Sequence, residues 1–148
     1  MDLTHFLDAQ ERDHAKAMAE LRAGRKRTHW IWYVFPILVG LRESSTALRF
    51  ALPDDEAARE YLRHPVLGAR LREAIAIVHE QVCAQEVPIA VLMGSDVDAH
   101  KLVSSLTLFS HVAADVADET LAQHAEAVLD AAQAQGIPRC ALTEAALT

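Results

Sequence analysis

Apolar residues recur at helical spacing along most of the chain, and strict alternation of apolar and polar positions appears nowhere over a useful length. Residues 3–22 predict an amphipathic helix, and Gly24 follows as its terminator. The stripe consists of Leu3, Phe6, Leu7, Gln10, His14, Ala17, Met18 and Leu21. Two of these are polar, and we expect them to make hydrogen bonds at the edge of the core, because buried polar groups need partners. A ligand role is the alternative.

Capping and helix-breaking residues divide the rest of the chain into further helical segments. We expect helices from Ser45 to Pro53, 56–64 capped by Asp54, 66–82 begun by Pro65, 89–93 closed by Gly94, from Ser95 or Asp96 to about 113, from Asp118 to 135, and 139–147. No heptad pattern persists long enough for a coiled coil. The sequence therefore predicts an all-α protein: a compact, multihelical orthogonal bundle of about seven or eight helices, with one domain over residues 1–148.

The stretch THWIWYVFP, residues 28–36, holds four of the chain's eight aromatic side chains. Read as a strand or as a helix, it is apolar on every side and therefore buried. A lone strand would have no partner, which favours a helix with Thr28 as N-cap and Pro36 at its end. Core packing is the expectation for Trp30, Ile31, Val34 and Phe35. For His29 and Trp32 the pattern leaves core packing and pocket lining equally open.

A second unusual stretch, GSDVDAHKLVSSLTLF, covers residues 94–109. On a helix, Asp98, Lys101, Ser104 and Ser105 share one side. An ammonium and two hydroxyls on rigid backbone could hold phosphate or carboxylate oxygens. The alternative is an exposed ion pair worth a few tenths of a kcal/mol, with serines bonded back to helix carbonyls. The glycine run of a phosphate-binding loop is absent.

Charge and length narrow the classes of function. The net charge is −7, and residues 85–148 hold only Lys101 and Arg139 against nine acids. An acidic half argues against nucleic-acid or anionic-membrane binding. The basic run from Arg22 to Arg27 fits a helix C-terminus, with a phosphate-bearing partner as the alternative. The longest apolar run, residues 30–35, is far shorter than the roughly 20 residues of a membrane-spanning helix. The charged N-terminus does not resemble a secretory signal. We therefore expect a cytoplasmic protein.

The remaining chemistry-bearing residues form no recognisable motif. Cys83 and Cys140 are too far apart in sequence for a zinc or redox motif, and we expect free thiols. The eight histidines are scattered, without a pair at i and i+4, and no nucleophile elbow surrounds Ser104 or Ser105. We therefore expect no metal and no cofactor.

Several segments together resemble one bacterial family, catalogued as domain of unknown function 1810. They are Ala9-Gln10, residues 20–36, Gly40-Leu41, residues 61–73 and residues 94–109. The resemblance covers residues 3 to about 135 and implies a compact, mainly α-helical domain of unestablished activity. Its pattern matches His29, Trp30, Trp32, Phe35, Pro36, Lys101, Ser104, Ser105, Thr107, Leu108 and Phe109. The chain departs from it at Ile37, where the family usually has Gln, and at Arg42, where it usually has Gly.

These features support two hypotheses. The first is a pocket for an anionic small molecule, such as a nucleotide or phosphorylated metabolite, where the aromatic stretch meets the long helix. Its ligand-binding residues would be His29, Trp30, Trp32, Lys101, Ser104 and Ser105, and His29 would be the candidate catalytic residue. The alternative is a non-catalytic interaction or homo-oligomerisation module that uses apolar helix faces. Whether the protein is an enzyme stays open.

Overall fold

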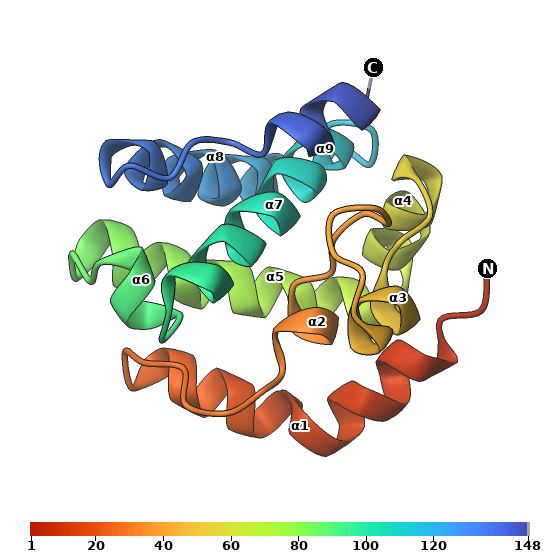
Figure 1. Cartoon of the computed structure of the whole chain (residues 1–148), viewed down its shortest axis with the longest axis horizontal. Helices are drawn as coiled ribbons and strands as arrows, with labels where there is room; N and C mark the ends of the chain where they lie inside the picture. Colours follow the sequence, from red (N-terminus) through yellow and green to blue (C-terminus); the bar gives the residue numbers. More distant parts are fainter. Residues whose placement is uncertain (148) are drawn as a thin grey trace.

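Nine α-helices and one π-helical segment follow one another in the computed structural model, which describes residues 1–147 (Figure 1). They are α1 (Thr4–Arg22), α2 (Ile31–Val34), α3 (Ser45–Phe50), α4 (Asp55–Arg63), α5 (Pro65–His79), the π-helix (Glu80–Ala84), α6 (Ile89–Leu92), α7 (Asp96–Ala113), α8 (Glu119–Ala134) and α9 (Ala141–Ala146). Within the described residues there is no strand, only an isolated parallel bridge between Leu38 and Leu52. The all-α class is confirmed, and α2 and α6 are single turns that bring the helices to nine.

Local sequence signals place most helix starts correctly. Side chains of Asp54, Ser95 and Asp118 accept hydrogen bonds from backbone amides in the first turns of α4, α7 and α8. The start of α3 is shifted by one residue, because Ser44 and not Ser45 accepts the capping hydrogen bond. These caps satisfy amides that a helix start leaves without partners, so short polar motifs fix the boundaries of the long helices.

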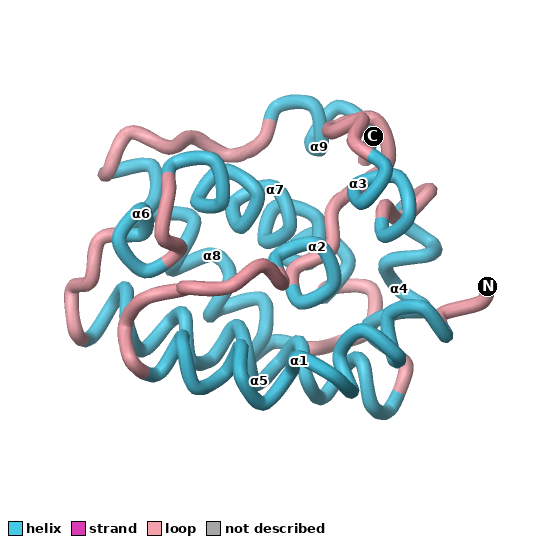
Figure 2. Tube along the Cα trace, turned by 60° about the horizontal axis from the view of Figure 1, so that its bottom comes forward, coloured by secondary structure: helices cyan, strands magenta, loops and turns pink. Residues whose placement is uncertain are grey.

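Helix α5 runs through the middle of the molecule, with α1 on one side and α8 on the other (Figures 1 and 2). Helix α7 packs against α8 and also contacts the short helices α2, α4, α6 and α9. The buried apolar side chains form one continuous cluster. No helix of the described chain is both long and apolar enough to cross a bilayer. Both unusual sequence stretches contribute buried side chains to this one cluster.

The two polar residues of the α1 stripe each make a hydrogen bond to a residue of another segment. Gln10 is buried and donates through Nε2 to the Tyr33 carbonyl and to the Tyr61 hydroxyl, each at 2.7 Å. His14 Nε2 lies 2.8 Å from Glu73 Oε1. Because α2 ends at Val34, the Tyr33 carbonyl is free to accept the Gln10 hydrogen bond. Both residues make hydrogen bonds as expected, but Gln10 lies inside the core and its Oε1 has no hydrogen-bond partner among the described residues.

The aromatic stretch differs from its predicted form. Only Ile31–Val34 is helical, Trp30 occupies the N-cap position, and the backbone beyond Phe35 is extended. The prediction of a helix capped by Thr28 is wrong, because the Thr28 amide and hydroxyl both donate to Glu20 of α1. A long-range carboxylate thus replaces the local cap.

The end of α5 also departs from the expectation of one helix through Val82. After His79 the backbone widens into the π-helix, and Gln81 donates to the carbonyls of Leu21 and Arg22 at 2.9 Å. Carbonyls at a helix C-terminus lack intrahelical partners. The Gln81 amide supplies partners for two of them, so this segment closes the end of α1.

Candidate functional site

Glu20 of α1 anchors the segment that leads into the aromatic stretch. Its Oε1 accepts from the amides of Arg27 (2.7 Å) and Thr28 (2.9 Å) and from the Trp30 indole N–H (3.0 Å), and its Oε2 accepts from the Thr28 hydroxyl (2.6 Å). Burial alone would raise the pKa of Glu20, but these hydrogen bonds outweigh it and lower the pKa from its ordinary 4.5 to about 2. One carboxylate therefore fixes the position of residues 27–30.

An ionic triad of Lys26, Asp98 and Lys101 joins this segment to α7. Asp98 Oδ2 lies 2.9 Å from Lys26 Nζ, and Asp98 Oδ1 lies 3.3 Å from Lys101 Nζ. The side chains are 5%, 16% and 13% exposed, respectively. The alternative considered for Asp98 and Lys101, an exposed ion pair, is therefore right about the pair and wrong about its exposure. The pair is largely buried because Lys26, expected at the solvated end of the first helix, lies in the interior instead.

Both lysines of the triad contact tryptophans of the aromatic stretch. Lys26 Nζ lies 5.0 Å from the Trp30 ring centroid and donates to the Thr28 carbonyl at 2.6 Å. Lys101 Nζ lies 4.1 Å from the Trp32 ring centroid. A cation over an indole face is attracted by the ring quadrupole. Two ammonium groups share one carboxylate here, so the triad leaves one excess positive charge beside Trp32.

Gly94 closes the triad from the α6 side. The amide of Lys26 donates to the Leu92 carbonyl at 2.7 Å, and a Cβ atom at Gly94 would lie 2.7 Å from the Lys26 carbonyl oxygen. Gly94 also has φ +81°, a region that residues with side chains rarely adopt. Only glycine allows this approach of the two loops.

We expect Gly94→Ala to destabilise the protein more than Gly136→Ala. Gly136 has a similar φ of +87° but open space around its missing Cβ, so its replacement costs only about 1 kcal/mol of backbone strain. At Gly94 the clash with backbone adds at least about 1 kcal/mol more. Urea unfolding of both variants measures the difference, and equal losses would contradict the close approach.

His29 and Trp32 line a pocket of about 410 Å³ between α1, α3 and the start of α2. The polar side chains that line it with them are Asp8, Arg12, Tyr33, Thr46 and Arg49. A pocket of this volume is in the range of small-molecule sites. His29 is exposed and Trp32 half-buried, so both side chains are accessible to a ligand.

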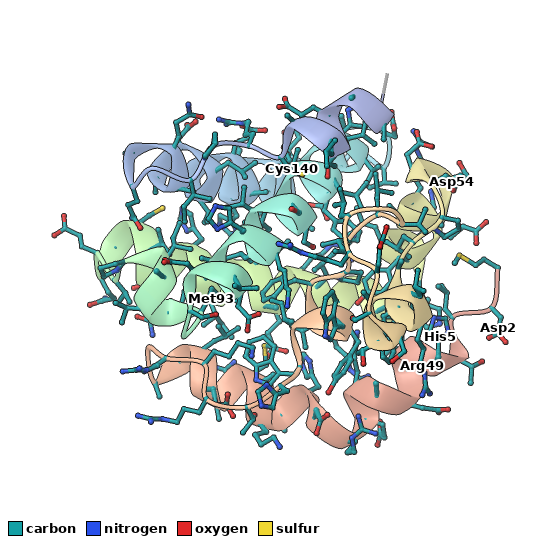
Figure 3. The ribbon with its side chains drawn as sticks, in the orientation of Figure 1. Asp2, His5, Arg49, Asp54, Met93 and Cys140 are labelled. Atoms are coloured by element: carbon teal, nitrogen blue, oxygen red, sulfur yellow. The ribbon has the colours of Figure 1, made fainter. Side chains whose placement is uncertain are left out.

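One cation of this pocket, Arg49, lacks an acidic partner among the described residues. Arg12 donates to Asp13 Oδ2 at 3.1 Å, which leaves most of its guanidinium free, and its side chain is 67% exposed. Arg49 lies beside His5 (Figure 3), 5.4 Å from the Phe50 ring centroid, and pairs with no carboxylate of the described residues. Asp8 supplies the one carboxylate of the lining. Guanidinium groups donate several hydrogen bonds in a fixed plane, so the arrangement suits anionic oxygens.

The Tyr33 hydroxyl at the pocket floor is fixed by the same region of α1. It donates to Asp13 Oδ2, and the His29 carbonyl oxygen lies 3.2 Å away. Burial and the neighbouring Asp13 raise the pKa of Tyr33. The hydroxyl thus stays protonated at neutral pH and links Tyr33 to Asp13 of α1.

The structure brings together only part of the predicted site. His29 and Trp32 share the pocket, and Lys101 lies against Trp32. Trp30 is completely buried and donates to Glu20, so it holds the segment in place without access to the pocket. The two serines lie elsewhere: Ser104 donates to the His100 carbonyl at 3.1 Å and lines a different cavity, and Ser105 is completely buried.

The two arginines were missed by sequence reasoning. Arg12 is on the polar side of the α1 stripe, four residues after Asp8, and that spacing alone reads as a solvated helix face. Arg49 sits in the last turn of α3, a position that basic residues commonly occupy for the helix dipole. Neither residue is part of the segments that carry the family resemblance, so only their spatial approach to His29 identifies them.

The donor set of the pocket suits anion binding and not metal ligation. Across residues 1–147 no three or more His, Cys, Asp or Glu side chains are grouped so that they could hold a metal ion. The pocket presents guanidinium, imidazole and hydroxyl groups around an indole ring. These groups can donate hydrogen bonds to an anion and stack on a planar group.

Comparisons with known proteins agree with this fold. The family model described as "Protein of unknown function (DUF1810)" matches residues 1–137. The crystal structure of the conserved hypothetical protein Rv1873 from Mycobacterium tuberculosis is similar, with a TM-score of 0.81 and 38% sequence identity over 97% of this chain and 94% of that one. A search of curated proteins finds no match. The similarity therefore establishes family and fold, and a function has to be argued from the site.

Proposed function

The chain belongs to the DUF1810 family, and we propose that it binds a small anionic molecule in the pocket formed by α1, α3 and the start of the aromatic stretch. The observation that carries this proposal is the meeting of His29 and Trp32 with two guanidinium groups, those of Arg12 and Arg49. A ligand with a phosphate or carboxylate and a planar ring matches both features.

Each side chain has a defined role in this proposal. Arg49 and Arg12 bind the anionic group, because charge-assisted hydrogen bonds to phosphate or carboxylate are about twice as strong as neutral ones. Trp32 is the stacking surface, and Lys101 holds the indole from the triad side, at 4.1 Å from the ring centroid. His29 is the candidate acid, base or hydrogen-bond donor, since its imidazole is exposed at the pocket.

Excess positive charge is the reason to expect an anion. Arg12 is paired with Asp13, so Arg49 and Asp8 are the remaining charges of the pocket lining, and the triad behind Trp32 adds two lysines against one aspartate. The two triad lysines are largely buried, so their charge is screened less by salt than that of the exposed arginines. A cationic ligand would meet this repulsion, and an anionic one would relieve it.

The first test is a thermal-shift screen of the wild-type protein and Arg49→Ala against nucleotides, phosphosugars and dicarboxylates. A ligand at 100 times its Kd should stabilise the wild type by about 2.7 kcal/mol. Arg49→Ala should weaken binding roughly 10- to 100-fold, because a hydrogen bond to a charged group contributes about 1.5–3 kcal/mol. At the same ligand concentration the stabilisation should then fall from about 2.7 kcal/mol to about 0.4–1.4 kcal/mol.

Arg63→Ala is the matched control. Like Arg49, Arg63 is the basic residue in the last turn of a short helix, but it lies in α4 and outside the pocket. It should keep the full ligand shift. A ligand shift that is equal in all three proteins would place the binding site elsewhere, and no shift with any compound would count against an anion pocket.

Homo-oligomerisation, the alternative function, stays a prediction. The exposed large apolar side chains belong to seven different segments: Met1, Val39, Leu48, Val66, Val91, Val97 and Leu142. A module that associates with a second copy should show a melting temperature that rises with protein concentration.

The basic run from Arg22 to Arg27 offers little to a nucleic acid, since Lys26 is buried and Arg22 pairs with Glu73 at 3.0 Å.

A further inference from the structure

The indole ring of Trp32 separates a buried cation from the pocket that contains His29. On one side of the ring, Lys101 of α7 places its Nζ 4.1 Å from the ring centroid. The pocket lies on another side, because its lining comes from α1, α3 and residues 29–33 and includes no residue of α7. Trp32 is therefore the group through which Lys101 can act on a molecule in that pocket.

The excess positive charge of the triad lies mainly on Lys101. The Asp98 carboxylate is 2.9 Å from Lys26 Nζ and 3.3 Å from Lys101 Nζ, so the nearer lysine is neutralised more completely. Only 13% of the Lys101 side chain is exposed, and salt therefore screens its charge weakly. A poorly compensated ammonium is thus held against the indole.

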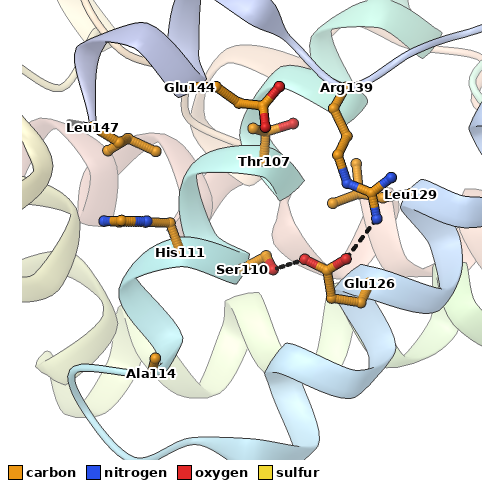
Figure 4. A pocket seen from close by; sticks show the side chains of 9 residues that line it. All are labelled: Thr107, Ser110, His111, Ala114, Glu126, Leu129, Arg139, Glu144 and Leu147. Atoms are coloured by element: carbon orange, nitrogen blue, oxygen red, sulfur yellow. Dashed lines mark hydrogen bonds and ion pairs between the residues drawn. The ribbon is translucent and has the colours of Figure 1, made fainter.

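Charge in the neighbouring cavity between α7, α8 and α9 is arranged in the opposite way. This cavity has a volume of about 420 Å³, and in it Arg139 donates to Glu126 at 2.6 Å (Figure 4) and to Asp130 at 2.9 Å. Two carboxylates there serve one guanidinium, whereas in the triad two ammonium groups share one carboxylate. Arg139 is therefore a reference cation whose charge is compensated.

An ammonium against one side of an indole changes what can stack on the rest of the ring. A free indole face carries negative charge and attracts cations, and aromatic pockets use this to bind quaternary ammonium groups. At Trp32 the attraction is already taken by Lys101. A second cation across the ring would meet the positive charge of the ammonium, while a neutral or anionic ring would not.

We propose that Lys101 sets the charge of the ring that stacks on Trp32, so that the pocket takes neutral or anionic rings and excludes cationic ones. This inference rests on the proposed anion pocket and names the class of its ligand: an aromatic phosphate or carboxylate whose ring carries no positive charge. Lys101 acts through Trp32 as a positioning residue, since it is absent from the pocket lining. The direct contact with the anion that the sequence suggested is not part of this role.

Fluorescence quenching of Trp32 measures the charge around its ring directly. The chain has two tryptophans, and Trp30 is completely buried, so soluble quenchers reach only Trp32 in the folded protein. The probes are iodide, caesium and acrylamide, which are an anion, a cation and a neutral molecule, each titrated at constant ionic strength. Each quenching constant is divided by that of free N-acetyltryptophanamide. We expect the corrected constant of the wild type to be several times larger for iodide than for caesium.

Three variants separate the charge of Lys101 from its packing. Lys101→Met removes the charge and leaves Asp98 paired with Lys26, and the ratio of iodide to caesium quenching should fall at least about threefold. Lys101→Arg keeps the charge and should keep the ratio. Arg139→Met changes the net charge by the same amount outside the triad and should also keep it. A mere change in ring position would alter acrylamide quenching too, whereas loss of charge moves iodide and caesium in opposite directions.

Two phosphates test the ligand class on the same proteins. Phenyl phosphate has a neutral ring, and phosphocholine has a quaternary ammonium group. Protection of Trp32 from acrylamide measures their binding, and wild type should bind phenyl phosphate more tightly, with a smaller difference in Lys101→Met. Quenching by iodide and caesium that depends on Lys101, without protection by either phosphate, would refute the anion pocket and leave the charge selection at Trp32 standing.

Three results would overturn the role of Lys101. The first is equal corrected quenching of the wild type by iodide and caesium, which needs no variant. The second is a ratio that is unchanged in Lys101→Met or that falls as much in Arg139→Met. The third is tighter binding of phosphocholine than of phenyl phosphate by the wild type.

Discussion

Replacing Asp98 by asparagine is expected to lower the free energy of unfolding by about 3–4 kcal/mol. The change keeps the size of the side chain but removes the carboxylate that Lys26 and Lys101 share at 2.9 and 3.3 Å. Lys26 is only 5% exposed and cannot regain water without moving the Thr28 segment. An uncompensated ammonium in the interior is therefore the main cost. Urea unfolding of the wild type and the variant, fitted with one common m-value, measures the loss of unfolding free energy.

Asp96→Asn is the matched control for Asp98→Asn. Asp96 lies two residues earlier in the same first turn of α7, but it is exposed and outside the triad. Its replacement should cost only the helix-dipole contribution of about 0.3–1 kcal/mol. Combining Asp98→Asn with Lys26→Met should recover much of the loss, since an apolar side chain can occupy the place of a buried ion. Equal losses for the two asparagine variants would refute the triad.

The second large effect is expected at Glu20. Glu20→Ala removes the acceptor of four hydrogen bonds and should cost about 2–4 kcal/mol. The Trp30 side chain is completely buried, so its indole N–H would lose its partner without gaining water. The backbone amides of Arg27 and Thr28 are nearer solvent and would suffer less. Chemical unfolding and near-ultraviolet circular dichroism of Trp30 follow the change.

Glu20 also predicts how stability depends on pH. Its pKa is lowered from 4.5 in the unfolded chain to about 2 in the folded one, so the folded state binds this proton more weakly. Its stabilising contribution is fully present above pH 4.5 and is lost as pH falls from 4.5 towards 2. Allowing for solvent screening of a partly exposed group, the contribution is about 2 kcal/mol. Glu20→Gln should flatten the wild-type decline in this window.

Glu43→Gln serves as the control for that titration. Glu43 is an exposed glutamate in the loop between α2 and α3, and it takes no part in the hydrogen bonds of Glu20. Its replacement should leave the slope of stability against pH as in the wild type between pH 4.5 and 2. A Glu20→Gln variant with the wild-type slope would show that Glu20 is not the group responsible.

Much of the fold could be predicted because helix signals are local. The spacing of apolar residues and the caps at Asp54, Ser95 and Asp118 lie within a few residues of the helices that they define. The burial of Trp30 followed from the uninterrupted apolar run that it begins, residues 30–35. The aromatic stretch was the exception, because Glu20, eight residues before Thr28, takes the groups that a local cap would have used.

The candidate site could be predicted only in part. His29 and Trp32 stood out because polar aromatic side chains are an unusual choice for filling a core. Lys101 stood out by its place in the family pattern, yet its neighbours Ser104 and Ser105 diverge from it in space. Serines three and four positions along a helix share its general side, but packing against α9 and the core directs them to other surroundings.

The sequence by itself determined the all-α class, most helix boundaries and the family, since these depend on short-range periodicity, capping and motif wording. Only the tertiary structure decided that Lys26 enters the core to share Asp98 with Lys101, and that Arg12 and Arg49 meet His29 and Trp32. Those encounters join segments 17 to 72 positions apart. Helix packing brings these segments together, and no local pattern in the sequence indicates which charged side chains will then be neighbours.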